Sequence, residues 1–264
     1  MNKYKLIAID IDGTLLTNSK EILNQTKIDI NKAFENGIVI CICTGRGYPA
    51  AKRYIDELNL NIPLILYNGA IIKMSNSDNL ILNKTINDLV SVEVFNTITK
   101  NNGTCCFWAN DILYFNKYDQ YTKYYEELTG IKAIIVENFT IDNIVNINKF
   151  LWFDTPENLE YIKKNVMNSV DGVDCFKSQK VILEIVPTNV NKGEAIKFLA
   201  NYYNIDISEV IAIGDDENDM SMISVAGLGV AMGNAKECVK EIADYITVSN
   251  EENGVGTIIN EFIL

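Results

Sequence analysis

Short segments in which nearly every residue is apolar recur near the start of the chain, and stretches with helical spacing separate them. The apolar segments are 4–10 (YKLIAID), 38–44 (IVICICT) and 64–70 (LILYNGA), and the helical spacing covers about 22–36 and 48–59. A strand that is apolar on both sides needs helices on each face of its sheet, as in parallel sheets. The pattern therefore predicts an α/β fold with a doubly wound parallel sheet.

The pattern changes in the middle of the chain. Between residues 83 and 186 the β-rich runs are short, and Asn110-Asp111 stands between two of them as a hairpin signal. Helical segments intervene, so this region predicts an α+β domain with an antiparallel sheet. The α/β alternation returns from Pro187 onward. We therefore predict a core built from residues 1–82 and 187–264, with a second domain of residues 83–186 inserted into it.

Composition excludes several classes of protein. The net charge of −12 offers no basic surface for a nucleic acid. No apolar run approaches the roughly 20 residues that cross a bilayer, and Asp10 interrupts the first apolar run too early for a signal peptide, so we expect a cytoplasmic protein with no membrane partner. The chain has no histidine, which excludes Ser-His-Asp and Cys-His catalysis. Its six cysteines include no C-x-x-C pair, and we interpret them as reduced, mostly buried thiols.

Polar residues follow the predicted parallel strands at the point where each strand ends. They are Asp10, Asp12, Gly13 and Thr14 after the first strand, Thr44, Gly45 and Arg46 after the second, Asn68 and Gly69 after the third, and Asp215 to Asp219 after VIAIG (210–214). Ligands of open parallel sheets bind beyond the carboxyl ends of the strands. We therefore expect one functional site at this edge of the sheet.

The first strand runs into two carboxylates, Asp10 and Asp12, that stand two residues apart. On an extended strand such side chains project to the same side, so the two acids can share a site that Asp215 reaches from another strand. Carboxylates this close repel one another unless a cation lies among them. Oxygen ligands without histidine favour Mg²⁺ over zinc.

Single residues of this set also have ordinary structural interpretations. Asp10 could cap a turn, Asp12-Gly13 is a common turn pair, and acids such as Asp219 suit the first turn of a helix. Lys192 opens a predicted helix, where a lysine belongs either to a solvated helix face or to a ligand site. The residues by themselves leave that choice open.

Four motifs match one known family: DIDGTLL (10–16), CTGR (43–46), NKGEAI (191–196) and GDDENDMSMI (214–223), with AMGNA (231–235) as a further match downstream. In this order they resemble the haloacid dehalogenase-like (HAD) phosphohydrolases, specifically the Cof-type group with a C2B cap. The combination of D-x-D-G-T with G-D-x-x-N-D is specific, and the similarity in layout spans the whole chain. The resemblance implies a HAD-like Rossmannoid core and a cap formed by residues 83–186.

The resemblance also implies roles for individual residues. Asp10 would be the nucleophile that forms an aspartyl-phosphate, and Asp12 the general acid and base. Asp10, the backbone carbonyl of Asp12, and Asp215 would bind Mg²⁺. The phosphate-binding residues would be Thr44, Gly45, Lys192 and Asn218, with Asp219 orienting Lys192 or a metal-bound water.

These roles describe a Mg²⁺-dependent phosphomonoesterase that acts on small phosphorylated metabolites, such as sugar phosphates, in the cytoplasm. Two alternatives remain open from the sequence. A phosphomutase of the same fold carries similar motifs, and a sensor of phosphorylated ligands would bind without catalysis, although such a sensor has no need of both Asp10 and Asp12. We expect a monomer with no nucleic-acid partner.

Overall fold

The chain divides into two compact units. The computed structural model describes residues 3–77, 79–137, 139–140, 145–165, 167 and 170–264. The first unit contains Met1–Arg46, Ala51–Leu82 and Asn191–Leu264, and the second contains Gly47–Ala50 and Asn83–Val190. The second unit thus continues past residue 186, because its last strand runs through Pro187 and a short connection follows.

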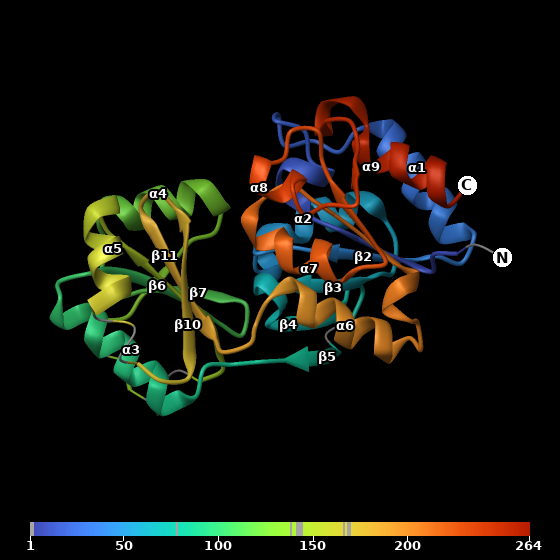
Figure 1. The fold of residues 1–264 in the computed structure, drawn as a ribbon. Coiled ribbons are helices and arrows are strands. Elements are labelled where there is room, and N and C mark those ends of the chain that lie inside the picture. The colour runs from blue at the N-terminus through green and yellow to red at the C-terminus, as the bar shows by residue number, and fades with distance from the viewer. Residues whose placement is uncertain (1–2, 78, 138, 141–144, 166, 168–169) are drawn as a thin grey trace. The chain divides into compact units, whose positions relative to one another are not determined.

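The described residues of the first unit are organised around an eight-stranded sheet with the order β14-β13-β12-β1-β2-β3-β4-β5 (Figure 1). The strands are β1 (Leu6–Ile9), β2 (Val39–Cys43), β3 (Pro63–Leu66), β4 (Ile71–Met74), β5 (Leu80–Asn83), β12 (Val210–Gly214), β13 (Leu228–Ala231) and β14 (Tyr245–Ile246). From β14 to β3 neighbouring strands run parallel, and β1 lies in the centre, paired with β2 and β12. The predicted α/β fold class is confirmed.

Helices cover both faces of this sheet, which explains why its strands are apolar on both sides. They are α1 (Asn24–Glu35), α2 (Tyr48–Leu58), α6 (Lys192–Tyr202), α7 (Met220–Val225), α8 (Glu237–Lys240) and α9 (Gly254–Phe262). Helix α1 packs against α9, and α6 packs against α7 on the opposite face (Figure 1). Every residue of β1 is fully buried between these layers.

Two predicted strands are shorter than the apolar runs suggest. The first strand ends at Ile9, before the two carboxylates, and the third ends at Leu66. The chain then turns at Tyr67–Gly69 and returns as β4, antiparallel to β3. The expectation of one strand over 64–70 was therefore wrong, because its apolar composition concealed the turn that Asn68-Gly69 forms.

The second unit contains a six-stranded, mostly antiparallel sheet with the order β10-β11-β9-β6-β7-β8 among its described residues. Its strands are β6 (Thr104–Ala109), β7 (Ile112–Phe115), β8 (Ile134–Ile135), β9 (Ile147–Phe153), β10 (Val173–Gln179) and β11 (Ile182–Pro187), and its helices are α3 (Asp88–Lys100), α4 (Gln120–Thr129) and α5 (Pro156–Asn165). Trp108 on β6 and Trp152 on β9 are buried, in agreement with a role in packing this sheet.

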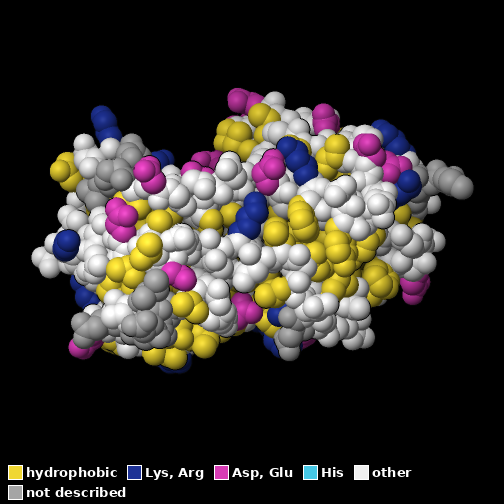
Figure 2. Space-filling model, turned by 90° about the horizontal axis from the view of Figure 1, so that it is seen from below, with side chains coloured by type: hydrophobic (Ala, Val, Ile, Leu, Met, Phe, Trp, Pro, Cys, Tyr) yellow, Lys and Arg dark blue, Asp and Glu magenta, His cyan; other side chains and the backbone are white. Residues whose placement is uncertain are grey.

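The surface carries charges of both signs. On the face drawn in Figure 2, acidic and basic side chains are interspersed, without a broad cluster of lysine and arginine.

Among the residues that the structure describes, no helix has the length and apolar character needed to cross a membrane.

Candidate active site

Strand β1 delivers Asp10 to the carboxyl edge of the core sheet. The Asp10 backbone N–H donates to Ile213 O at 3.1 Å, which continues the parallel pairing with β12 for one residue beyond the strand. A tight turn over Ile11–Leu15 follows, closed by a hydrogen bond of 3.1 Å from Leu15 N to Asp10 O. The D-x-D-G-T segment is therefore a turn, and its residues do not alternate as they would in a strand.

Gly13 allows a second carboxylate to approach this turn. Its φ is +79°, a conformation that favours glycine, and a Cβ at this position would overlap the Asp215 side chain. Thr14 Oγ1 donates a hydrogen bond to Asp215 Oδ1 at 2.9 Å. The loop after β12 is thereby held against the loop after β1, with Asp215 beside Asp10.

Lys192 lies in the interior of the site. The side chain is 0% exposed, and its Nζ donates to Asp10 Oδ1 and to Asp219 Oδ1, each at 2.6 Å. Gly193 permits this burial, because it packs directly on Ser221 of α7 and leaves no room for a side chain. Of the two interpretations of Lys192 that the sequence leaves open, the solvated helix face is wrong.

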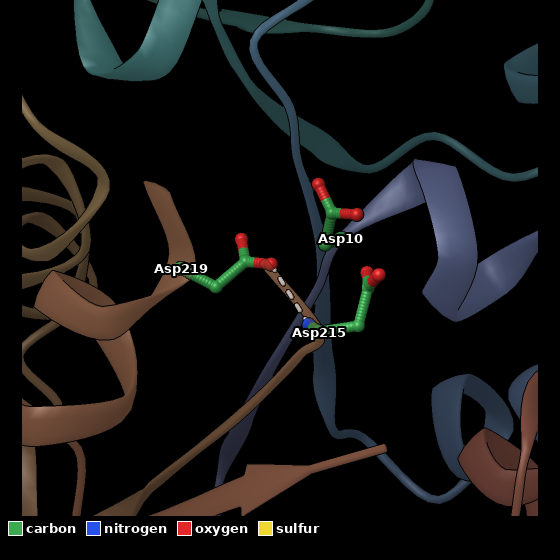
Figure 3. A group of neighbouring side chains, drawn as sticks. All are labelled: Asp10, Asp215 and Asp219. Atoms are coloured by element: carbon green, nitrogen blue, oxygen red, sulfur yellow. Dashed lines mark hydrogen bonds between the residues drawn. The ribbon is translucent and has the colours of Figure 1, made fainter. Parts of the chain in front are cut away.

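Asp219 supports both Lys192 and the loop that carries Asp215. While Oδ1 accepts from Lys192, Oδ2 accepts from the backbone N–H groups of Asp215 and Asp216 at 2.9 and 3.0 Å. Figure 3 shows the carboxylate of Asp10, which follows β1, near those of Asp215 and Asp219, which follow β12. One oxygen from each lies within 4.8 Å of the others, close enough to hold a metal ion.

Burial and crowding of like charges shift the pKa values in this cluster. Burial raises the pKa of Asp10 well above its ordinary value, and Asp219 and Asp215 raise it further, while Lys192 opposes the change. Burial, followed by the charge of Asp219, raises the pKa of Asp215 to about 7. The pKa of Lys192 is raised although burial alone would lower it, because Asp10 and Asp219 outweigh burial.

These residues fit a hard divalent cation. The available donors are carboxylate oxygens, and the raised pKa values of Asp10 and Asp215 report a local excess of negative charge that a cation offsets. Both oxygens of Asp219 already accept hydrogen bonds. Asp10 and Asp215 are therefore the better-placed ligands, and Asp219 is suited to a supporting role.

The Asp12 side chain is bonded by two basic side chains. Its two oxygens accept a bidentate pair from Arg46, at 2.6 Å from Nε and 2.7 Å from Nη2, and Lys20 Nζ lies 3.0 Å from Oδ1. Burial would raise the pKa of Asp12, but the bonds from Arg46 outweigh burial and lower it to about 2. The two acids were expected on one extended strand, but β1 ends at Ile9 and Asp12 lies in the turn, so strand alternation does not apply to them.

The remaining predicted residues lie at the ends of neighbouring strands. Thr44 is buried after β2, and its Oγ1 accepts from Arg46 N at 3.1 Å. Gly45 packs against the Asn68 amide, and Asn218 Nδ2 donates to Asn68 Oδ1 at 3.1 Å. The structure thus assembles the predicted residues at one edge of the core sheet.

Sequence reasoning assigned no role to Thr14, Arg46 and Asn68, although each of these side chains contacts the set. Each had a usable signal, because Thr14 belongs to the D-x-D-G-T motif and the other two follow β2 and β3 directly. Their partners lie far away in the sequence, however. Only the folded chain shows that Arg46 bonds Asp12 and that Asn68 bonds Asn218.

Comparisons with known proteins extend over nearly the whole chain. A family model described as haloacid dehalogenase-like hydrolase matches residues 7–259. The chain is 34% identical to the putative phosphatase YxeH of Bacillus subtilis over 99% of each protein. It is 31% identical to YwtE of the same organism, a 5-amino-6-(5-phospho-D-ribitylamino)uracil phosphatase, over 98% of each protein. A crystal structure of a haloacid dehalogenase-like hydrolase from Bacteroides thetaiotaomicron matches with a TM-score of 0.89 at 29% identity, covering 97% of this chain and 98% of that chain.

Proposed function

The chain belongs to the haloacid dehalogenase-like hydrolases and is a phosphatase of that family, and we propose that it is a Mg²⁺-dependent phosphomonoesterase for small phosphorylated metabolites such as sugar phosphates. The observation that carries the proposal is the buried contact of Lys192 with Asp10, next to Asp215. The relative YwtE is named for a substrate with a phosphorylated ribityl chain, which supports a sugar-like leaving group.

Asp10 is the proposed nucleophile. Its carboxylate attacks phosphorus, the bond from phosphorus to the ester oxygen breaks, and the alcohol leaves with a proton while an aspartyl-phosphate forms. Water then attacks the phosphorus of this intermediate, which releases inorganic phosphate and restores Asp10. Lys192 reduces the repulsion between the carboxylate and the phosphate dianion, because its positive charge lies 2.6 Å from Asp10.

Asp10 and Asp215, with the backbone carbonyl of Asp12, are the proposed ligands of Mg²⁺. The bound ion supplies positive charge to the phosphoryl oxygens during transfer. Thr44, Gly45, Lys192 and Asn218 are the proposed contacts of the phosphoryl group.

Asp12 is the proposed proton donor to the leaving alcohol and the base for the attacking water. While Asp12 holds its bidentate bond to Arg46, its lowered pKa keeps the carboxyl group ionised. Protonation of the leaving group therefore requires Asp12 to separate from Arg46 and gain a proton before the first step. The domain of residues 83–186 is the proposed cap, which selects the leaving group and excludes water.

Release of inorganic phosphate from a panel of phosphorylated metabolites tests this function. We expect turnover with Mg²⁺, none in excess EDTA, and none for Asp10→Asn. A phosphomutase would instead convert a sugar phosphate to its isomer, and a sensor would bind the ligand without turnover. Full turnover by Asp10→Asn would refute the covalent mechanism.

Single-turnover kinetics distinguish the proposed roles of Asp10 and Asp12. Asp12→Asn should slow cleavage of a sugar phosphate by roughly 10² to 10⁴, because an alkoxide needs a proton. Cleavage of p-nitrophenyl phosphate should slow far less, since p-nitrophenolate leaves without one. Equal slowing of both substrates would contradict the assignment of Asp12.

A further inference from the structure

The turn after β3 has an unusual backbone conformation. Tyr67, Asn68 and Gly69 have φ values of +52°, +57° and +107°, so three successive residues adopt positive φ. This conformation is unfavourable for a bulky residue such as tyrosine, and it persists only where surrounding contacts impose it. Backbone strain of this kind concentrates at functional sites, so the contacts of the turn point to what it positions.

Three segments of the active site hold the turn. Asn68 N donates to Thr44 O, and Tyr67 N donates to Arg46 O, each at 3.0 Å. Gly69 packs closely against Asn191, the residue before Lys192: a Cβ on Gly69 would lie 2.5 Å from Asn191 O. The turn thus contacts the segment after β2 and the start of α6.

The Asn68 side chain reaches the third segment, the loop after β12. Asn68 is 5% exposed, and a Cβ on Gly45 would lie 2.9 Å from Asn68 Oδ1 and 3.2 Å from its Nδ2. The same Oδ1 accepts a hydrogen bond from Asn218 Nδ2 at 3.1 Å. The amide therefore lies between Gly45 and Asn218, two of the proposed contacts of the phosphoryl group.

We propose that Asn68 is a positioning residue that orients the amide of Asn218 for phosphate binding. The hydrogen bond to Asn68 occupies one of the two N–H groups of Asn218 and fixes the plane of its amide. The second N–H is then the one that donates to a phosphoryl oxygen. This inference rests on the proposed function, because phosphate binding by Asn218 is part of it.

A purely structural interpretation is that Asn68 only joins the loops after β2 and β12. The two interpretations differ in how Asn68 and Asn218 combine. If Asn68 acts through Asn218, its removal has little further effect once the Asn218 amide is gone. If it only joins the loops, its removal also disturbs Thr44 and Gly45, and the losses add.

The test uses Asn68→Gly, Asn218→Ala and the double variant. Glycine accepts the φ of +57° at position 68, so the substitution removes the amide without adding strain. Asn204→Gly is the matched control, because Asn204 is exposed and has a φ of +56° at the end of α6, away from the site. Should Asn68→Gly be too unstable to purify, Asn68→Ser also removes the contact with Asn218 and is interpreted in the same way.

Calorimetry of the Mg²⁺-loaded protein gives the Kd of inorganic phosphate, and steady-state kinetics gives KM and kcat. We expect Asn68→Gly to raise Kd and KM about tenfold, as for a lost hydrogen bond to a charged ligand, with a smaller change in kcat. In the Asn218→Ala background the same substitution should change Kd less than about twofold. Asn204→Gly should change none of these values.

Each contrary result is distinct. Equal effects of Asn68→Gly with and without Asn218 would overturn the inference in favour of a structural role. An unchanged Kd in Asn68→Gly, with a weakened Kd in Asn218→Ala, would overturn the inference and leave the proposed function intact. An unchanged Kd in Asn218→Ala would remove Asn218 from the proposed phosphate site, and the inference with it.

Discussion

Lys192→Met tests how much the buried lysine contributes to the stability of the folded protein. Methionine is similar in length to lysine but carries no charge, so the substitution changes the electrostatics more than the packing. Lys192 is 0% exposed and lies 2.6 Å from both Asp10 and Asp219. Its removal leaves two buried carboxylates without their positive partner, since neither side chain is more than 7% exposed.

Removing one partner of a buried ion pair costs roughly 3–5 kcal/mol of unfolding free energy, and we expect Lys192→Met to lose this amount at pH 7.5. The loss should shrink at lower pH. Lys192 opposes the raised pKa of Asp10, so without it the pKa in the folded state rises further above the unfolded value. Folding then takes up a proton between these two values, and stability increases as pH falls. We expect the deficit to be smaller at pH 5.5 than at pH 7.5.

Urea denaturation in EDTA measures this effect without a metal ion. Both tryptophans, Trp108 and Trp152, belong to the second unit, so their fluorescence follows that unit, whereas far-UV circular dichroism follows the whole chain. Lys197→Met is the control, because Lys197 lies on the same helix but is 48% exposed and bonds only the exposed Glu194 among the ion pairs described. A deficit for Lys192→Met as small as that of the control, about 0.5 kcal/mol or less, would refute the reasoning.

Three further changes have defined outcomes. Gly13→Ala should lower the free energy of unfolding by about 1–3 kcal/mol and remove most of the activity, because the new Cβ overlaps Asp215. Gly37→Ala is the control: Gly37 has a similar φ of +81° but nothing within 4 Å of a Cβ, so the loss should be only about 1 kcal/mol. Equal losses would show that the overlap with Asp215 is unimportant. Arg46→Gln should lower the free energy of unfolding by about 1 kcal/mol at pH 7, a modest loss because the Asp12 side chain is 40% exposed. In urea denaturation at different pH values this loss should disappear between pH 4 and 2, where the wild-type Asp12 takes up its proton. A loss that does not change with pH would argue against the ion pair. In assays of phosphate release, Mg²⁺ should restore the activity of EDTA-treated protein. Ca²⁺ should inhibit the activity, because its larger and looser coordination shell misplaces the carboxylates. Full activity without metal would contradict the proposed ligands.

The sequence predicted elements well where burial and local periodicity agree. The segment LIAI is apolar at every position and forms the fully buried central strand β1. It predicted less well where a turn interrupts an apolar run. Tyr67 continues the apolar pattern of β3, yet it adopts a positive φ because backbone bonds from its turn to Thr44 and Arg46 require it.

For the active site, too, the sequence predicted some features and not others. The positions of Asp10, Thr44 and Asp215 directly after apolar segments predicted that they lie at one sheet edge, because parallel strands bring their carboxyl ends together. The direction of each side chain was less predictable. Asp12 was expected on the same strand as Asp10, but it lies in the turn over Ile11–Leu15, where its side chain bonds Arg46.

The sequence by itself determined a buried parallel sheet with acids at the carboxyl ends of its strands, because hydrophobic periodicity and strand ends are local properties of the chain. Only the tertiary structure decided which charges are paired. Lys192 is far from both Asp10 and Asp219 along the chain, and its burial depends on the close contact of Gly193 with Ser221. The packing of α6 on α7 decides whether a lysine at the start of α6 faces water or two carboxylates. A local sequence pattern does not predict that packing.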